Sequence, residues 1–253
     1  MKVDLNSDSG ESFGSWIMGD DAAMARIVSS LNVACGFHAG DPDVARTTCR
    51  AAAESGAAVG AHVSYPDLQG FGRRVMDMGH DELVNSVIYQ IGALQAIAAA
   101  SGTRVAYVKP HGALYNHIAR DEAQARAVAE GIASVSTDLP ILVLPHSEIA
   151  TAAETAGLRA VPEVFADRGY NSDGSLVSRR EQGAVLHDAD EIASRVVRMV
   201  KNGLVTAVDG SEIRVDAQSV CVHGDTPGAV EIARTIRRSL DEAGIVVESF
   251  AAA

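Results

Sequence analysis

Short apolar runs alternate along this chain with longer amphipathic segments, and this alternation constrains the fold more than any other feature. Seven runs are rich in Val, Ile, Leu and Ala: Val3–Asn6, Leu31–Phe37, Ala57–Val63, Val105–Lys109, Ile141–Pro145, Ala160–Phe165 and Ser219–His223. Continuous runs of this kind are typical of parallel strands that are buried on both faces. Strands that alternate with helices predict a parallel sheet with right-handed crossovers.

The segments between the runs have the pattern of helices that cover such a sheet. In His80–Ala100, apolar residues recur every three or four positions, and Asp41-Pro42 is the start signal of a helix that ends near Gly56. Further helices are predicted at Asp121–Ser134, Ser147–Ala156, Asp188–Lys201 and from Thr226-Pro227 to Gly244. We therefore expect an α/β protein with one domain over residues 1–253, an irregular seven-stranded (β/α) barrel with a β-hairpin insertion at 205–216. A doubly wound open sheet is the alternative architecture.

Composition excludes several classes of protein. The net charge of −12 disfavours binding to nucleic acid or to an anionic membrane surface. No uninterrupted apolar run approaches the length of a membrane span, and the first residues lack the pattern of a signal peptide, so we expect a cytoplasmic location. Three cysteines without zinc-ligand spacing argue against a disulfide framework and against a structural zinc site.

Polar residues gather where the predicted strands end. In chain order they are Asn6, Asp8 and Glu11; His38 and Asp41; His62; Lys109 and His111; His146; Glu163, Asp167 and Arg168; and His223 and Asp225. The carboxyl ends of parallel strands meet on one face, where α/β enzymes place their active sites. Each residue also has a structural reading, for example Asp41 as a helix cap, but independent structural histidines have no reason to prefer one end of the strands.

Two segments are suited to anions. Residues 223–228 place small residues at a helix N-terminus, and Gly70–Arg74 carries the adjacent guanidinium groups of Arg73 and Arg74, which have a solvated loop as the alternative reading. The sequence contains no P-loop, no dinucleotide fingerprint and no G-x-S-x-G nucleophile motif. Acid–base or metal-assisted chemistry is therefore favoured over a serine nucleophile.

Seven motifs resemble those of the LamB/YcsF family, the A subunits of bacterial 5-oxoprolinases, in the order that the family has them. They are Asp4–Gly14, Asn32–Pro42, Gly60–His62 with Tyr65–Asp67, Gly70–Arg74, Val108–Asn116, Glu163–Arg168 and His223–Ala229. Ser7 is a small departure, because the family usually has cysteine or another small residue there. The resemblance implies a seven-stranded barrel of the glycoside-hydrolase/deacetylase type and ATP-dependent opening of the 5-oxoproline lactam to L-glutamate. It also implies B and C subunits as partners, ATP as co-substrate, and a small-molecule substrate; a homo-oligomer is compatible with it.

The resemblance suggests roles for the clustered residues. Asp8, His38 and His62 are expected as an acid–base centre, or as ligands of a transition metal, because related deacetylases hold a metal with an Asp and two His. A second possible metal is Mg²⁺ with ATP. Lys109 and His111 are assigned to the phosphorylated oxygen, Glu11 to catalysis, and Arg73 or Arg168 to the substrate carboxylate. The remaining residues expected to bind substrate are Asn6, Arg74, Glu163, His223 and Asp225.

Two other functions fit the same residues. The first is a metal-dependent deacetylase or amidase that acts alone on a carbohydrate or amide, without ATP. The second is a non-catalytic protein that binds a lactam or carbohydrate, although the clustering of titratable groups disfavours it.

Overall fold

Seven parallel strands close into a barrel in the computed structural model, which describes residues 1–178, 181–224 and 228–251. The strands are β1 (Lys2–Ser9), β2 (Ser30–Ala34), β3 (Ala58–His62), β4 (Val105–Val108), β5 (Ile141–Val143), β6 (Ala160–Phe165) and β9 (Ser219–Val222). β1 pairs with β2 on one side and with β9 on the other, and this pairing closes the sheet. The predicted seven-stranded (β/α) barrel is confirmed, and the open sheet is excluded.

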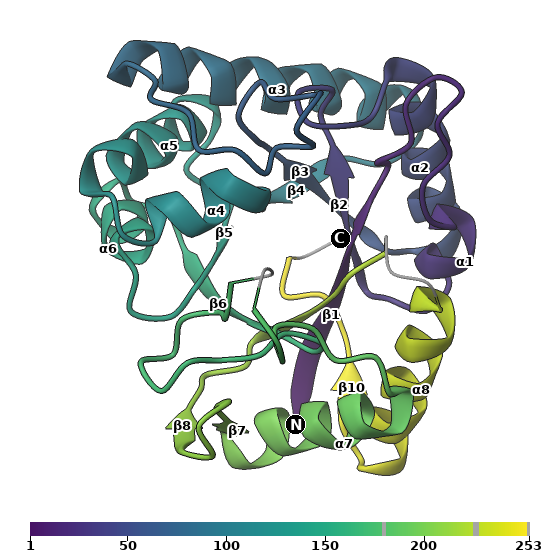
Figure 1. The fold of residues 1–253 in the computed structure, drawn as a ribbon. Helices are drawn as coiled ribbons and strands as arrows, with labels where there is room; N and C mark the ends of the chain where they lie inside the picture. Colours follow the sequence, from purple (N-terminus) through teal and green to yellow (C-terminus); the bar gives the residue numbers. More distant parts are fainter. Residues whose placement is uncertain (179–180, 225–227, 252–253) are drawn as a thin grey trace.

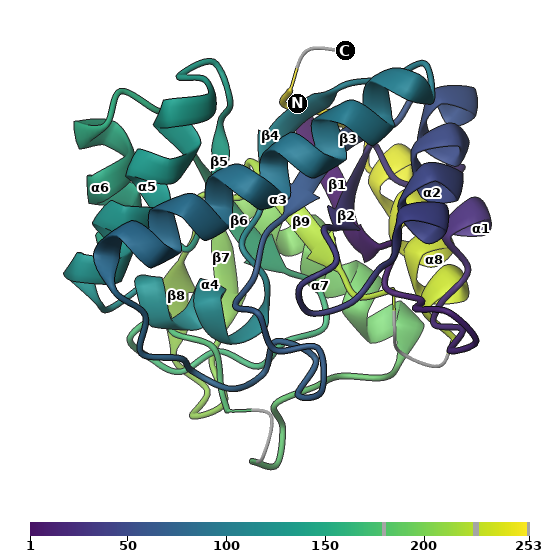
Figure 2. The ribbon, with the colours of Figure 1, turned by 90° about the horizontal axis from the view of Figure 1, so that it is seen from above.

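Helices surround the barrel, as Figures 1 and 2 show. They are α1 (Asp21–Ala25), α2 (Pro42–Ser55), α3 (His80–Ala100), α4 (Gly112–Ile118), α5 (Glu122–Val135), α6 (Glu148–Thr155), α7 (Ala189–Asn202) and α8 (Ala229–Glu242). The predicted start and end of α2 are confirmed. The Asp41 carboxylate accepts hydrogen bonds from the backbone N–H groups of Asp43 and Val44, and Gly56 ends the helix in the left-handed conformation.

The irregular parts of the barrel lie at three places. β10 (Val246–Val247) adds to the start of β1, outside the closed sheet. The strands β7 (Leu204–Thr206) and β8 (Glu212–Arg214) form an antiparallel hairpin before β9. In β3 the register with β4 shifts between Val59 and Gly60, and a side chain at position 60 would overlap the ring of Tyr107. Glycine therefore lets Tyr107 cross the barrel interior.

Helix α3 is long enough and apolar enough to cross a membrane by length and composition alone. In the structure it packs against α2 and α5, and it buries Leu83, Val87 and Ile91. Its buried Gln90 exchanges hydrogen bonds with the backbone of Ser64. These contacts are typical of a core helix in a barrel.

The barrel interior holds a buried polar network, whereas (β/α) barrels are normally filled by branched apolar side chains. Asn32 donates hydrogen bonds to Asn6 (2.7 Å) and to Asp8 (2.8 Å), and Tyr107 donates to Asn32 (2.6 Å). Asn6 in turn donates to Glu163 (2.8 Å). This buried network connects β1, β2, β4 and β6, so it holds the polar side chains at the carboxyl ends of these strands in fixed positions.

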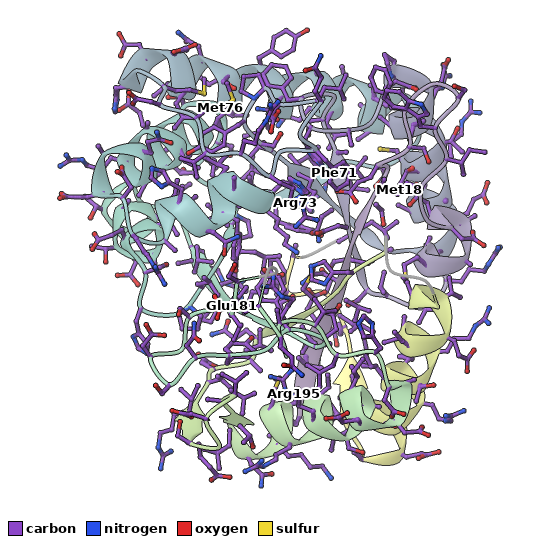
Figure 3. All side chains as sticks on the ribbon, in the orientation of Figure 1. Met18, Phe71, Arg73, Met76, Glu181 and Arg195 are labelled. Atoms are coloured by element: carbon purple, nitrogen blue, oxygen red, sulfur yellow. The ribbon has the colours of Figure 1, made fainter. Side chains whose placement is uncertain are left out.

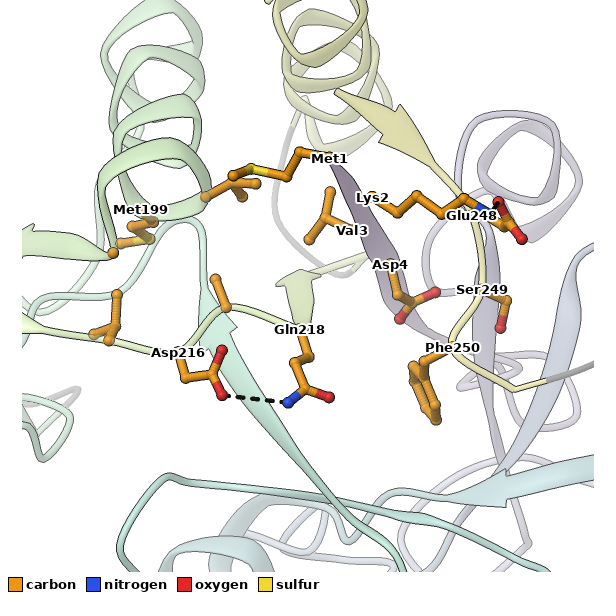
Figure 4. Close-up of a pocket in the computed structure, with 14 residues that line it drawn as sticks. Met1, Lys2, Val3, Asp4, Met199, Asp216, Gln218, Glu248, Ser249 and Phe250 are labelled. Carbon is orange, nitrogen blue, oxygen red and sulfur yellow. Dashed lines mark hydrogen bonds and ion pairs between the residues drawn. The ribbon is translucent and has the colours of Figure 1, made fainter. Parts of the chain in front are cut away.

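Asp4 lies at the opposite end of the interior and carries a testable pH dependence. Its buried carboxylate accepts hydrogen bonds from Ser29, Ser30 and Ser219, and burial raises its pKa from about 3.8 to about 6. Figure 4 shows Asp4 beside a cavity of about 430 Å³ at the start of β1. The folded state binds the Asp4 proton more tightly than the unfolded state does. Asp4 therefore adds to the free energy of unfolding at low pH, and this contribution is lost as the pH rises from about 4 to 6.

We therefore expect Asp4→Asn to flatten the pH dependence of stability. Relative to the wild type, the variant should gain up to about 3 kcal/mol between pH 4 and pH 7, because one pKa unit corresponds to about 1.4 kcal/mol. Urea denaturation across this pH range measures the difference. Asp216→Asn, at an exposed residue beside the same cavity (Figure 4), is the matched control and should follow the wild type. Parallel profiles for the wild type and Asp4→Asn would show that Asp4 does not titrate in this way.

Candidate active site

Four buried side chains converge where β1 to β4 end. Glu11 follows β1, His38 follows β2, His62 is the last residue of β3, and His111 precedes α4. One nitrogen or oxygen from each side chain lies within 4.8 Å of the others. We call Glu11, His38, His62 and His111 the histidine cluster.

Backbone carbonyls determine which nitrogens of the cluster carry hydrogen. His62 Nδ1 is 2.9 Å from the carbonyl oxygen of Lys109, and His111 Nε2 is 2.9 Å from that of Phe71. A carbonyl only accepts, so both of these nitrogens donate. In neutral rings the remaining nitrogens, His62 Nε2 and His111 Nδ1, then present lone pairs to each other at 3.0 Å. Such an arrangement requires a cation between them, either a shared proton or a metal ion.

The electrostatics of the cluster favour neutral imidazoles at His38 and His111, beside a carboxylate. Burial and the neighbouring histidines hold the pKa values of His38 and His111 well below their usual range. Glu11 Oε1 lies 3.0 Å from His38 Nε2, 3.5 Å from His111 Nδ1 and 4.0 Å from His62 Nε2. Neutral imidazoles and a carboxylate suit a first-row transition metal, and N–H···O=C contacts behind His62 and His111 are the usual support of metal-bound histidines. The cluster therefore fits a metal ion.

Asp8 does not join the cluster as the sequence suggested, although it borders it. Its Oδ2 is 3.4 Å from His62 Nε2, whereas its Oδ1 is 2.9 Å from Lys109 Nζ. Burial alone would raise the pKa of Asp8, but its interactions with His62 and with the Lys109 ammonium outweigh burial and hold that pKa well below its usual range. Asp8, His38 and His62 were the predicted metal ligands. His38 and His62 lie in the cluster, and its other two members are Glu11 and His111.

Lys109 connects the histidine cluster to the barrel interior. Its buried ammonium lies 2.9 Å from Asp8, 3.2 Å from Glu163 and 2.9 Å from Cys221 Sγ. Burial alone would lower the pKa of Lys109, but Asp8, Cys221 and Glu163 raise it well above its usual value. Lys109 is therefore a fixed positive charge beside the cluster.

The segment after β3 packs directly over the cluster. A side chain at Gly72, which has a φ of 61°, would lie 2.6 Å from the His111 ring and 2.9 Å from the His38 Cβ. Phe71 and Arg73 lie next to each other in the upper half of Figure 3, with the guanidinium 5.5 Å from the ring centroid. Exposed Arg73 helps to hold the pKa values of His38 and His111 low, and the carbonyl of nearby Phe71 accepts from His111, so Arg73 lies at the edge of the cluster.

The other residues that were predicted to bind substrate lie outside the histidine cluster or outside the described residues. Exposed Arg74 pairs with Asp67 within its own loop. Arg168 donates to the carbonyl oxygens of Ala184 (3.0 Å) and Val177 (2.5 Å), so it holds the segment after β6 in place. His223 pairs with Asp167 at 2.8 Å. Asp225 lies outside the described residues.

Sequence reasoning missed three polar residues of this region. Asn32 and Tyr107 occur inside apolar strand runs, and Tyr115 lies one turn after His111 on α4. Asn32 and Tyr107 could have been found as polar residues within apolar strand runs, because a polar side chain that points into a barrel must be hydrogen-bonded there. For Tyr115 no signal separates it from an ordinary core tyrosine.

Comparisons with known proteins identify the family. A model of the LamB/YcsF family matches residues 3–253. The chain belongs to the LamB/YcsF family. Among relatives, the 5-oxoprolinase A subunit of Kocuria rhizophila is 61% identical over 98% of this chain and 99% of its own. The protein of the same name from Paracidovorax citrulli is 59% identical over 99% of this chain and 100% of its own.

Solved structures show the same fold. The crystal structure of a lactam utilization protein from Thermus thermophilus is 45% identical, has a TM-score of 0.94, and covers 99% of this chain and 100% of its own. A T48 deacetylase with substrate shares the barrel at a TM-score of 0.51 and 12% identity, over 97% of this chain and 86% of its own. The second likeness concerns the fold alone.

Proposed function

We propose that this LamB/YcsF chain is the A subunit of a 5-oxoprolinase, which opens the 5-oxoproline lactam to L-glutamate with ATP and with B and C subunits. The observation that carries the proposal is 61% identity over nearly the full length to a protein named for this role. The buried His, Glu, Asp and Lys groups at the strand ends supply chemistry that the reaction needs. The nucleotide site is proposed to be unconventional or to lie on a partner protein, since the sequence has no P-loop.

The reaction makes specific demands on the site. A lactam is a poor electrophile, and phosphorylation of its amide oxygen would create a leaving group and an activated carbon. Water then adds to that carbon, and the C–N bond breaks with a proton passing to the ring nitrogen, which leaves an acyl phosphate. A second water hydrolyses the acyl phosphate to the carboxylate and free phosphate. Each positioned acid or base typically contributes about 10²–10⁴-fold in rate.

The residues can be matched to these demands. Glu11 and the histidines are the acid–base groups, because they are buried, close together and held by backbone carbonyls. Lys109 and His111 are placed to stabilise charge on the phosphorylated oxygen. Arg73, at the edge of the cluster, is the better candidate for the substrate carboxylate, because the Arg168 guanidinium donates to Ala184 and Val177.

A metal ion is part of this proposal, held by Glu11, His38, His62 and His111; when bound it would polarise an oxygen of the substrate or of water. We expect the purified, untagged chain to bind one equivalent of Zn²⁺ or Co²⁺ by calorimetry. His62→Gln with His111→Gln should weaken binding at least about 100-fold, since ligand loss removes a coordinate bond. His146→Gln, at an exposed histidine, is the control. Equal binding by the double variant and the wild type would rule out this site.

The same cluster favours a second candidate, a metal-dependent deacetylase or amidase that acts alone. Glutamate release from 5-oxoproline, measured by omitting one component at a time, separates the two functions. We expect release only when this chain, its partner subunits and ATP are all present, and no acetate from acetylated sugars. Deacetylation by the chain alone, with no glutamate in any mixture of folded subunits, would favour the second candidate.

A further inference from the structure

An aspartate–histidine pair lies at the strand ends outside the histidine cluster. His223 directly follows β9, and Asp167 lies two residues after β6. His223 Nδ1 is 2.8 Å from Asp167 Oδ1 and 2.9 Å from Asp167 Oδ2. Both side chains are buried, with 7% and 5% of their surface exposed. Because the contact is buried and uses both carboxylate oxygens, it holds the imidazole in one orientation.

The register of the barrel places His223 beside Asp8. β9 pairs with β1 so that Val222 lies opposite Ser7, and the next residues along the two strands are His223 and Asp8. A side chain at Gly224 would lie 2.6 Å from the backbone oxygen of Asp8, so the two segments stay packed together beyond the strands. β6, which leads to Asp167, pairs with the other edge of β9. His223 is therefore flanked by carboxylates from both neighbouring strands.

Asp8 connects the pair to the histidine cluster, because its Oδ2 is 3.4 Å from His62 Nε2. The cluster follows β1 to β4, and the pair follows β6 and β9, which complete the barrel on its other side. Asp8 and His223 have 12% and 7% of their side-chain surface exposed, whereas the histidines of the cluster have 2% or less. A small molecule that reaches the strand ends from solvent therefore meets His223 as well as Asp8.

The contact with Asp167 determines what each nitrogen of His223 can do. A carboxylate only accepts, so Nδ1 donates to Asp167, and Nε2 is the nitrogen that can exchange a proton with a substrate. Asp167 also compensates positive charge on the ring, so the ring can carry a proton on both nitrogens. The cluster has the opposite character, because burial and the neighbouring histidines hold the pKa values of His38 and His111 well below their usual range. The strand ends thus combine proton acceptors with one imidazole suited to donate.

We propose that His223 is a catalytic residue of lactam opening and that Asp167 is its positioning residue. When the C–N bond breaks, the electron pair of that bond stays on the ring nitrogen, which takes the proton from His223 Nε2. His223 is left neutral and regains a proton from solvent. This inference rests on the proposed function and deepens it, because it assigns the protonation of the leaving nitrogen to His223 and the activation of water to the histidine cluster.

Glutamate release from 5-oxoproline by the reconstituted assembly tests the role of His223. We expect His223→Gln to lower kcat about 10²–10³-fold and to keep KM within about threefold of the wild type, because proton transfer is lost while binding remains. His80→Gln is the matched control and should keep the wild-type kcat. His80 also lies 3.0 Å from a carboxylate, that of Glu130, but both side chains are exposed. Wild-type kcat in a folded His223→Gln chain would overturn the inference.

Asp167→Asn tests the positioning role, and it keeps the inference testable if His223→Gln does not fold. Asparagine keeps the size of the side chain but cannot compensate positive charge on the His223 ring, so kcat should fall about 100-fold. Asp167→Glu restores a carboxylate and should be at least about 10-fold faster than Asp167→Asn. Glu130→Gln is the exposed control. Wild-type kcat in a folded Asp167→Asn chain would show that His223 does not act through Asp167, contrary to the inference.

Chemical rescue separates proton transfer from a structural role. Imidazole added to an assembly with His223→Ala should raise its kcat at least about 10-fold, since free imidazole can carry the missing proton. A lowered Tm together with a loss of activity that imidazole does not restore would mean that His223 only supports packing, and would overturn the inference. If the wild-type assembly of folded subunits releases no glutamate, the proposed function fails together with the inference. If it releases glutamate and the His223 and Asp167 variants match it, the inference alone fails.

Discussion

Lys109→Met is expected to destabilise the protein by about 3–5 kcal/mol and to remove its activity. The methionine keeps the volume of the side chain but leaves the carboxylates of half-buried Asp8 and buried Glu163 without their common cation. Removing one partner of a buried ion pair lowers the free energy of unfolding by about this amount, because the remaining charge stays buried and uncompensated. Urea denaturation at pH 7 measures the free energy of unfolding, and glutamate release by the reconstituted assembly measures activity.

The matched control is Lys201→Met, which makes the same change at an exposed residue near the end of α7. It should change stability by less than about 0.5 kcal/mol, as surface substitutions usually do. A loss of less than about 1 kcal/mol in Lys109→Met would show that Lys109 does not compensate these carboxylates. Wild-type kcat in a folded Lys109→Met chain would remove Lys109 from the catalytic assignment.

Glu11→Gln is expected to lower kcat about 10³-fold with a small effect on folding. Glutamine keeps the shape of the side chain, but it can neither take a proton nor neutralise a cation among the three histidines. Glu11 Oε1 faces His38, His62 and His111 at 3.0–4.0 Å, so the lost charge lies at the centre of the cluster.

The control for this variant is Glu54→Gln on the exposed face of α2, which removes the same charge far from the strand ends. Steady-state rates and circular dichroism of both variants separate catalysis from folding. A Glu11→Gln enzyme that keeps kcat within threefold of the wild type would contradict the role of the cluster.

Much of the fold followed from the sequence because its signals are local. The continuous apolar runs identified all seven barrel strands, and Asp41-Pro42 with Gly56 marked the start and end of α2. The convergence of His38, His62 and His111 followed from the rule that parallel strands end on one face. The short helices α1 and α4 and the two-residue β10 were missed, because segments of this length carry little periodic pattern.

The details of the site could not be predicted, because they depend on contacts between distant segments. Asp8 and Glu11 are three residues apart, and only the structure shows that Asp8 contacts Lys109 and His62 while Glu11 lies closest to His38. Arg74 binds Asp67 and Arg168 binds backbone carbonyls, although their sequence positions suggested substrate. The tautomers of His62 and His111 are determined by carbonyls of Lys109 and Phe71, which no sequence pattern reveals.

We propose that the lactam is opened at the histidine cluster of this chain. The most direct test adds increasing amounts of this chain to a fixed excess of partner subunits, ATP and 5-oxoproline, and measures the rate of glutamate release. We predict a rate that rises in proportion to the wild-type chain, does not rise with Glu11→Gln, and falls when that variant competes with the wild type for its partners. A rate that is independent of this chain, or equal for both forms, would contradict the claim.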